Sequence, residues 1–148
     1  MTDERLPEGY EISTDADRLD RAVIHRYLSE DSYWARGIPQ HVMERSLQNS
    51  LCFGLYHQGA QVGLARVVTD YATFALLADV FVLPAHRGLG LSKRLVERVT
   101  THPDLQGLRR WLLVTADAHG LYTQYGFEPL AAPARFMEIA RPDTYRGG

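Results

Sequence analysis

An apolar run that ends abruptly in a glycine loop constrains this chain more than any other stretch. Residues 74–83 read FALLADVFVL and carry one charge, Asp79, before Pro84 ends the run. The loop at residues 87–92 reads RGLGLS, and the residues beyond it repeat their apolar side chains at helical spacing. The pattern predicts a buried strand, a tight turn, a glycine loop and an amphipathic helix, in that order.

The predicted loop has the chemistry of an anion site. Gly88 and Gly90 lack a Cβ, so an anion can approach their backbone closely, and Arg87 adds a fork of donors suited to phosphate. The start of the following helix contributes free N–H groups and a partial positive charge. Two glycines also fit an ordinary turn, so the loop by itself leaves both interpretations open.

Comparison with known phosphate-binding motifs helps to decide whether the loop is an anion site or an ordinary turn. The third glycine of the dinucleotide-binding fingerprint is missing, and so is the Walker sequence G-x-x-x-x-G-K-[ST]. The stretch V-x-P-x-x-R-G-x-G-x-[GAS] resembles the acyl-CoA pyrophosphate loop of the GNAT N-acetyltransferase superfamily, and Ser92 stands where glycine or alanine is commoner. The segment Ala118–Phe127 is similar to that family's A-x-x-[LF]-Y-x-x-x-G-F motif. The matching loop positions are Val82, Pro84, Arg87, Gly88 and Gly90.

The resemblance implies a fold. We expect one domain over residues 1–148 of class α/β (α+β), with a GNAT-like mixed, mostly antiparallel sheet of six to seven strands. A central parallel pair splays apart to hold the thioester, and about four helices flank the sheet. The sequence pattern agrees, because predicted hairpins come first and strands then alternate with helices. The predicted strands include 10–13, 51–57, 62–69, 74–83, 110–115, one following Gly126 and a closing strand at 134–140.

The resemblance also implies an activity. We expect an acetyl-CoA-dependent N-acetyltransferase that acts on the amine of a small molecule by direct transfer in a ternary complex. The alternatives are a module that binds or senses acyl-CoA without turnover, a protein or peptide N-acetyltransferase, and a loop that binds another phosphate ligand such as a nucleotide. The residues expected to hold coenzyme A are Phe81, Val82, Arg87, Gly88, Leu89, Gly90, Leu91 and Ser92.

Two residues are predicted to be catalytic. Tyr122 fills the family's tyrosine position, from which a phenol donates a hydrogen bond or proton to the departing sulfur; its alternative is a core aromatic. Strand alternation places Asp79 on one face with Leu77 and Phe81. A carboxylate there is costly unless it is functional or paired, so Asp79 is either a base or substrate contact or the structural partner of Arg66.

The turn after the predicted strand 110–115 leaves further alternatives open. His119 titrates near neutrality and is either a base or proton relay, or a half-exposed residue in a helix that Asp117 caps. Thr115 stands where the family commonly has an asparagine that contacts CoA, so that contact is not expected here. The resemblance also implies that the acceptor side lies in the connection between the first two helices and in the hairpin after them. The residues expected there are Tyr33, Trp34, Arg36, Asp70 and Tyr71, an aromatic wall with charges of both signs.

The composition of the chain indicates the cellular compartment and the classes of binding partner to expect. The 148 residues have a net charge of −2, which indicates neither nucleic-acid nor membrane binding. The single cysteine, Cys52, fits a reducing cytoplasm, and MTDERLPEGY lacks the pattern of a signal peptide. The six histidines show no metal-ligand spacing, so no metal is expected. The sequence leaves a homodimer open.

Overall fold

The computed structural model describes residues 6–145, which form a five-stranded sheet in the order β1-β2-β3-β4-β5. Neighbouring strands are antiparallel from β1 to β4, and β5 is parallel to β4. This mixed, mostly antiparallel arrangement confirms the predicted class. The strands are β1 Tyr10–Ser13, β2 Leu51–His57, β3 Ala60–Thr69, β4 Phe74–Val82 and β5 Arg110–Leu113.

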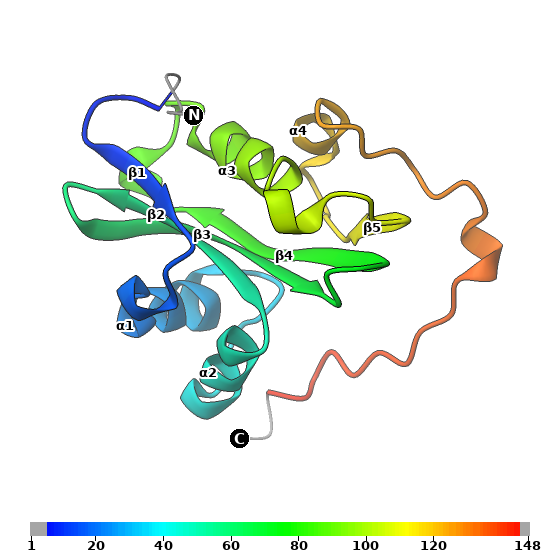
Figure 1. Ribbon diagram of the computed structural model, residues 1–148. Coiled ribbons are helices and arrows are strands. Elements are labelled where there is room, and N and C mark those ends of the chain that lie inside the picture. Colours follow the sequence, from blue (N-terminus) through cyan, green and yellow to red (C-terminus); the bar gives the residue numbers. More distant parts are fainter. Residues whose placement is uncertain (1–5, 146–148) are drawn as a thin grey trace.

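Helices cover both faces of the sheet (Figure 1). One face packs on α3, and the other packs on α1 and α2. Strand β2 is therefore buried along five of its seven residues, as expected for a strand covered on both sides. The helices are α1 Arg21–Arg26, which continues into a π-helical turn Tyr27–Asp31, α2 Gln40–Gln48, α3 Leu91–Thr100 and α4 His119–Thr123.

The helix boundaries follow from local chemistry. The carboxylate of Asp20 accepts the N–H of Val23 and starts α1, while Asp15 caps a separate 3-10 turn, Ala16–Arg18. Residues 16–26 therefore form two short helical elements rather than one continuous helix. Helix α3 starts after Gly90, which has a φ of 74° that favours glycine.

A β-bulge in β4 corrects the predicted strand faces. Asp79 has a φ of +54°, and Asp79 and Val80 together lie opposite the single residue Ala65 of β3. The extra residue reverses the alternation. Leu77 therefore packs in the α3-side core, whereas Phe81 packs in the core beneath α1 and α2. The expectation that Leu77 and Phe81 share a face is wrong for this reason.

Strands β4 and β5 separate after a short pairing. Residues Phe74 to Leu77 pair with Arg110 to Leu113, and β4 then continues to Val82 without β5 beside it. The predicted splayed pair is therefore present. It leaves one side of the second half of β4 open to another strand-like group.

The predicted number of strands is higher than the structure has. Neither the segment after Gly126 nor residues 134–140 forms a strand within the described part of the chain. Pro129 and Pro133 lack N–H donors, and Pro133 starts a 3-10 turn, Pro133–Arg135. The chain after α4 runs in a wide arc away from the sheet instead of returning along β5 (Figure 1).

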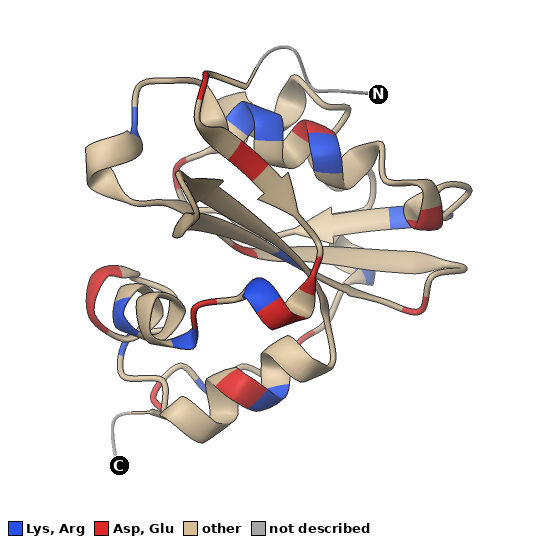
Figure 2. Ribbon diagram, turned by 60° about the vertical axis from the view of Figure 1, so that its left-hand side comes forward, with Lys and Arg blue, Asp and Glu red and all other residues tan. Residues whose placement is uncertain are grey.

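Charges of both signs are distributed over the described elements (Figure 2). Helix α3, for example, carries Lys93, Arg94 and Arg98 together with Glu97. Among residues 6–145, no helix is long and apolar enough to cross a membrane.

Candidate active site

The glycine loop lies directly after β4 and opens toward solvent. Gly88 and Gly90 have φ values of +85° and +74°, and a Cβ added at either one would meet no atom within 4 Å. Helix α3 has no side-chain N-cap; its first turn contains no acid and includes Lys93. Its leading N–H groups and its dipole are therefore not satisfied by an acidic side chain of the helix, an arrangement that suits a phosphate.

Arg87 braces this loop. Its Nε donates to the carbonyl oxygen of Val82 at 2.9 Å, and Nη2 donates to the Tyr27 hydroxyl at 3.2 Å. The ring of Tyr27 in turn stacks on Phe81, with ring centroids 4.1 Å apart. Two of the guanidinium donors predicted to face phosphate are thus committed to the protein, and the sequence did not reveal Tyr27 as their partner.

Backbone alternation decides which amides of β4 face the open side. Leu83 N–H donates to Val62 of β3 at 2.8 Å, and the register is continuous back to Phe81. Since alternate residues of a strand point to the same neighbour, Phe81 N–H faces β3, whereas Val80 and Val82 face the gap left by β5. The carbonyl oxygen of Val82 accepts a hydrogen bond from Arg87 on the side away from β3, in agreement with this assignment.

Tyr122 comes from α4, beyond the end of β5. Its side chain is 9% exposed, belongs to the α3-side core and meets Phe127 edge-to-face. Burial raises the pKa of the Tyr122 phenol, and Tyr33 and Asp117 raise it further. The phenol therefore stays protonated at neutral pH and can donate a hydrogen bond.

A hydrogen bond to Tyr33 links two segments that are far apart in the sequence. Tyr33 lies between α1 and α2, yet its hydroxyl accepts a hydrogen bond from Ala116 N–H, in the β5–α4 turn, at 3.0 Å. Its ring meets Trp34 edge-to-face, with centroids 5.0 Å apart. Tyr33 and Trp34 are 57% and 41% exposed, so this aromatic pair borders the open end of the splayed strands. No sequence signal predicted the contact with Ala116.

The carboxylate of Asp79 accepts hydrogen bonds from two side chains. Its Oδ2 accepts from Arg66 Nε, and its Oδ1 accepts from Trp34 Nε1, both at 2.7 Å. Arg66 also donates to Ser50 Oγ at 3.0 Å. The Asp79 and Arg66 side chains are only 10% and 17% exposed. The predicted pairing with Arg66 is present, and the Asp79 carboxylate also fixes Trp34 at the aromatic pair.

The β3–β4 hairpin places Asp70 in a different role from the one predicted. Its carboxylate accepts the N–H groups of Ala72, Thr73 and Phe74 and the Thr73 hydroxyl. These bonds, the Thr73 hydroxyl foremost, hold the pKa of the Asp70 carboxyl well below its usual range. Asp70 therefore builds its own turn, at the end of β4 opposite the glycine loop. Tyr71, in this turn, and Arg36, near Trp34, are exposed.

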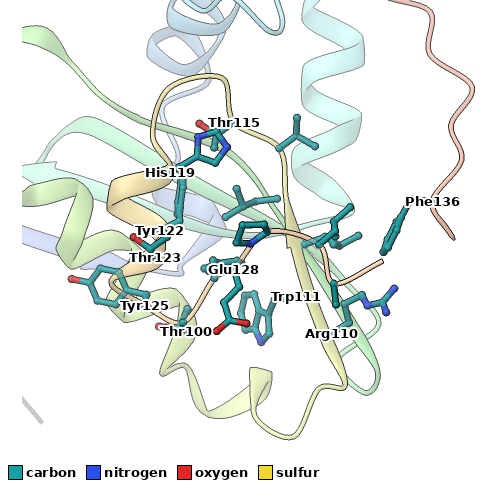
Figure 3. A pocket seen from close by; sticks show the side chains of 18 of the residues that line it. Thr100, Arg110, Trp111, Thr115, His119, Tyr122, Thr123, Tyr125, Glu128 and Phe136 are labelled. Atoms are coloured by element: carbon teal, nitrogen blue, oxygen red, sulfur yellow. The ribbon is translucent and has the colours of Figure 1, made fainter. Parts of the chain in front are cut away.

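A separate cavity of about 1140 Å³ lies between β5, α4 and the chain that follows α4 (Figure 3). His119 and Tyr122 line it at one end, and Arg110 and Phe136 line it at the other. No residue of the glycine loop lines this cavity. The cavity is thus separate from the glycine loop, and Tyr122 lines it while belonging to the α3-side core.

The β5–α4 turn shows which polar residue supports the start of α4. Thr115 Oγ1 accepts the N–H of Ala118, so Thr115 rather than Asp117 supports the start of α4. His119 is exposed at the first position of α4. Among the described residues there is no group of three metal-binding side chains.

Comparison with known proteins adds to this geometry. The family model described as an acetyltransferase (GNAT) domain matches residues 48–129, more than half of the chain. The chain belongs to the GNAT family. This membership confirms the resemblance seen in the glycine loop and the tyrosine segment, and acetyltransferases of the family use acetyl-CoA.

Relatives of this GNAT protein agree in sequence and fold. A crystal structure of a candidate GNAT acetyltransferase from Xanthomonas campestris pv. campestris is 54% identical, covers 95% of this chain and 98% of its own, and has a TM-score of 0.92. A candidate acetyltransferase of Gibberella zeae is 34% identical over 76% of this chain and 75% of its own length. An acetyltransferase structure from Clostridium acetobutylicum that contains acetyl-CoA shares the fold, at 13% identity, 88% and 94% coverage and a TM-score of 0.61.

Proposed function

We propose that this GNAT protein is an acetyl-CoA-dependent N-acetyltransferase that transfers the acetyl group directly to the amine of a small molecule. The observation that carries the proposal is the glycine loop at the end of β4. Its backbone is left-handed at Gly88 and Gly90, open to solvent, and followed by an uncapped helix. These features fit a diphosphate, because the space in which a Cβ of Gly88 or Gly90 would lie is not filled by any other residue of the described chain.

The proposed cofactor site follows the open side of β4. The backbone of residues 87–92 and the first turn of α3 bind the diphosphate, and Arg87 holds that loop against the end of the strand. The gap-facing backbone groups of Val80 and Val82 offer a donor for the thioester carbonyl and strand-like partners for the pantetheine arm. Bound acetyl-CoA supplies the acetyl group as an activated thioester.

Tyr122 is the proposed donor to the departing sulfur. Burial favours its neutral form, so the phenol holds a proton at the pH at which an amine is acylated. The hydrogen bond from Ala116 N–H to the Tyr33 hydroxyl ties the turn that precedes α4 to the α1–α2 connection, which supports a position of Tyr122 near the acceptor side. A hydrogen bond that strengthens as negative charge develops on sulfur lowers the activation barrier and leaves the affinity for acetyl-CoA unchanged.

The proposed acceptor site lies beside Tyr33 and Trp34. Their exposed rings suit an apolar or cationic group, and the Arg66–Asp79 pair fixes Trp34 from below. Because both Asp79 oxygens already accept hydrogen bonds, we assign Asp79 a positioning role in preference to that of the base. The amine then loses its proton to water or to a group of the acceptor itself.

Incubation with acetyl-CoA and a panel of small amines, with release of free thiol as the readout, tests the proposal. Cys52 is buried and its own thiol will not interfere, because burial raises its pKa to about 11. Thiol release with at least one amine is expected. Coenzyme A binding without release across a broad panel would instead indicate the non-catalytic module.

The variant Tyr122→Phe tests the assigned donor. We expect kcat to fall by about 100-fold, the low end of the usual contribution of a proton donor, while the affinity for coenzyme A stays unchanged. Tyr125→Phe is the matched control, since the Tyr125 hydroxyl contacts Arg94 of α3 instead. Equal losses in the two variants, or a parallel loss of coenzyme A affinity, would remove Tyr122 from the mechanism.

A further inference from the structure

His86, the residue before Arg87, ties the start of the glycine loop to the sheet. Among residues 84–90 it alone is not exposed. Its Nδ1 lies 2.6 Å from the hydroxyl of Tyr10, which comes 76 residues earlier in the chain. Because a hydroxyl both donates and accepts, this hydrogen bond forms with either tautomer of the imidazole. The Tyr10 side chain therefore holds the entry to the loop through a polar contact that the sequence did not reveal.

Tyr10 is itself held in place by its neighbours. It is the first residue of β1 and pairs with His57, the last residue of β2. The rings of Tyr10 and His57 have centroids 4.4 Å apart, and the ring of His57 also lies 5.1 Å from that of His86. The backbone is joined at the same point, since Gln58 N–H donates to the carbonyl oxygen of Gly9 at 2.9 Å. Rings from three segments thus pack together at this end of the sheet.

Two consecutive residues, His86 and Arg87, anchor the loop from opposite faces of the sheet. Arg87 donates to the hydroxyl of Tyr27, which belongs to the core beneath α1 and α2. Tyr10, in contrast, packs against the α3-side core. Residues 88–90, which follow, are exposed. The two tyrosine hydroxyls are therefore fixed points directly before the exposed glycines.

A diphosphate can be bound by this loop only if the backbone N–H groups lie in defined positions. Gly88 and Gly90 have left-handed backbones, and a Cβ added at either would meet no atom within 4 Å, so packing at those two positions does not restrict the loop. Glycine also has more conformational freedom to lose than any other residue. A loop that becomes ordered only when the ligand binds has a lower affinity by the cost of that ordering. Anchors just before the first glycine reduce this cost.

We propose that Tyr10 is a positioning residue for coenzyme A, which acts through His86 to hold the glycine loop in the conformation that binds the diphosphate. The inference rests on the diphosphate site of the proposed function. It depends neither on the identity of the acceptor amine nor on the role of Tyr122. Because the Tyr10–His86 bond is present before and during the transfer, it affects the affinity for the cofactor and leaves the chemical step unchanged.

Calorimetric titration of Tyr10→Phe with coenzyme A tests the inference. The phenylalanine ring keeps the contact with His57, while the hydrogen bond to His86 is lost. We expect the Kd for coenzyme A to rise by about 3- to 10-fold, the usual net effect of one hydrogen bond. In turnover assays the KM for acetyl-CoA should rise while kcat stays unchanged, as expected when binding is lost equally from the ground state and the transition state.

Tyr56→Phe is the matched control. Tyr56 lies in β2 directly before His57, and its buried hydroxyl has no hydrogen-bond partner within the part of the chain that the structure describes. This variant removes the same atom from a neighbouring tyrosine without breaking a hydrogen bond. Its Kd for coenzyme A should equal that of the unaltered chain.

A double-mutant cycle shows whether Tyr10 acts through His86. Adding Tyr10→Phe to His86→Leu should raise the Kd no further than His86→Leu alone, because Tyr10 then has no bond left to lose. His86→Asn restores a polar atom near the position of Nδ1 and should bind coenzyme A more tightly than His86→Leu. This rescue distinguishes a hydrogen bond from mere packing of the side chain.

The outcomes separate this inference from the proposed function. Equal Kd values for Tyr10→Phe and the unaltered chain overturn the inference alone. So do equal rises in Tyr10→Phe and Tyr56→Phe, fully additive effects in the double variant, or a Kd of His86→Asn no lower than that of His86→Leu. An unaltered chain that fails to bind coenzyme A contradicts the proposed function as well.

Discussion

Replacing Gly90 with alanine separates the strain of a left-handed backbone from the loss of a phosphate-binding surface. Gly90 has a φ of +74°, and a Cβ there would contact no atom within 4 Å. The cost to the free protein is therefore conformational alone, about 1–2 kcal/mol for a left-handed alanine. Lower entropy of the unfolded chain offsets part of this, by about 0.4–1 kcal/mol. The net loss of about 1 kcal/mol lowers Tm by about 3 °C in a chain of this size.

The effect on ligand binding should be much larger. The space that is empty in the free protein is where the diphosphate is proposed to contact backbone N–H groups, and a Cβ would hold the phosphate away. Loss of one or two charge-assisted hydrogen bonds costs about 2–4 kcal/mol, which corresponds to a roughly 30- to 1000-fold higher Kd for coenzyme A. Calorimetric titration with coenzyme A measures this, and thermal unfolding measures the stability.

Gly59 offers a matched control. It lies in the β2–β3 turn with a φ of +87°, and a Cβ there would likewise meet nothing within 4 Å. Gly59→Ala should lower Tm as much as Gly90→Ala does, yet leave the Kd for coenzyme A unchanged. Equal Kd values for the two variants would refute the argument, because strain rather than contact would then explain whatever change is seen.

Three further predictions test individual contacts. Asp79→Asn leaves the largely buried Arg66 without its counter-ion, so urea denaturation should show a loss of about 2–4 kcal/mol; a change below about 0.5 kcal/mol would contradict the structural role of the pair. Tyr33→Phe removes the acceptor of Ala116 N–H, and that amide should exchange faster with solvent while the amides of β2 do not; unchanged exchange at Ala116 would mean that the contact is not formed. Burial raises the pKa of the Cys52 thiol from 9.0 to about 11, so its contribution to stability is complete below pH 9 and is lost as pH rises toward 11, by about 1.4 kcal/mol per pH unit at most. The slope of unfolding free energy against pH in this window should be less negative in Cys52→Ala, and equal slopes would show that the thiol does not titrate there.

The Arg66–Asp79 pair illustrates how far sequence reasoning could reach. A carboxylate in an apolar strand required a partner or a function, and Arg66 was the expected partner. The bond from Trp34, which lies 45 residues away, was not predictable, because nothing in the local pattern specifies that the α1–α2 connection folds over β4. The bulge at Asp79 was missed as well, since it depends on the pairing of β4 with β3.

Residues 134–140 illustrate a sequence prediction that the structure does not bear out. The pattern of residues 134–140 is that of a strand, but a strand exists only where another strand accepts its hydrogen bonds, and Pro129 and Pro133 carry the described chain away from β5. Arg87 is a related case. Its guanidinium suits phosphate, yet in the folded chain Val82 and Tyr27 take two of its donors.

What the sequence determined by itself is local. The bounds of β2, the glycine loop and the apolar stripe of α3 follow from steric and hydrophobic rules that act over a few residues, and these features were enough to recognise the family. The tertiary structure decided which partners meet: the pairing of Asp79 with Trp34, the contact of Tyr33 with Ala116, and the separation of β5 from the end of β4. These depend on how the helices and strands pack together, since each contact joins residues whose positions are set by different elements.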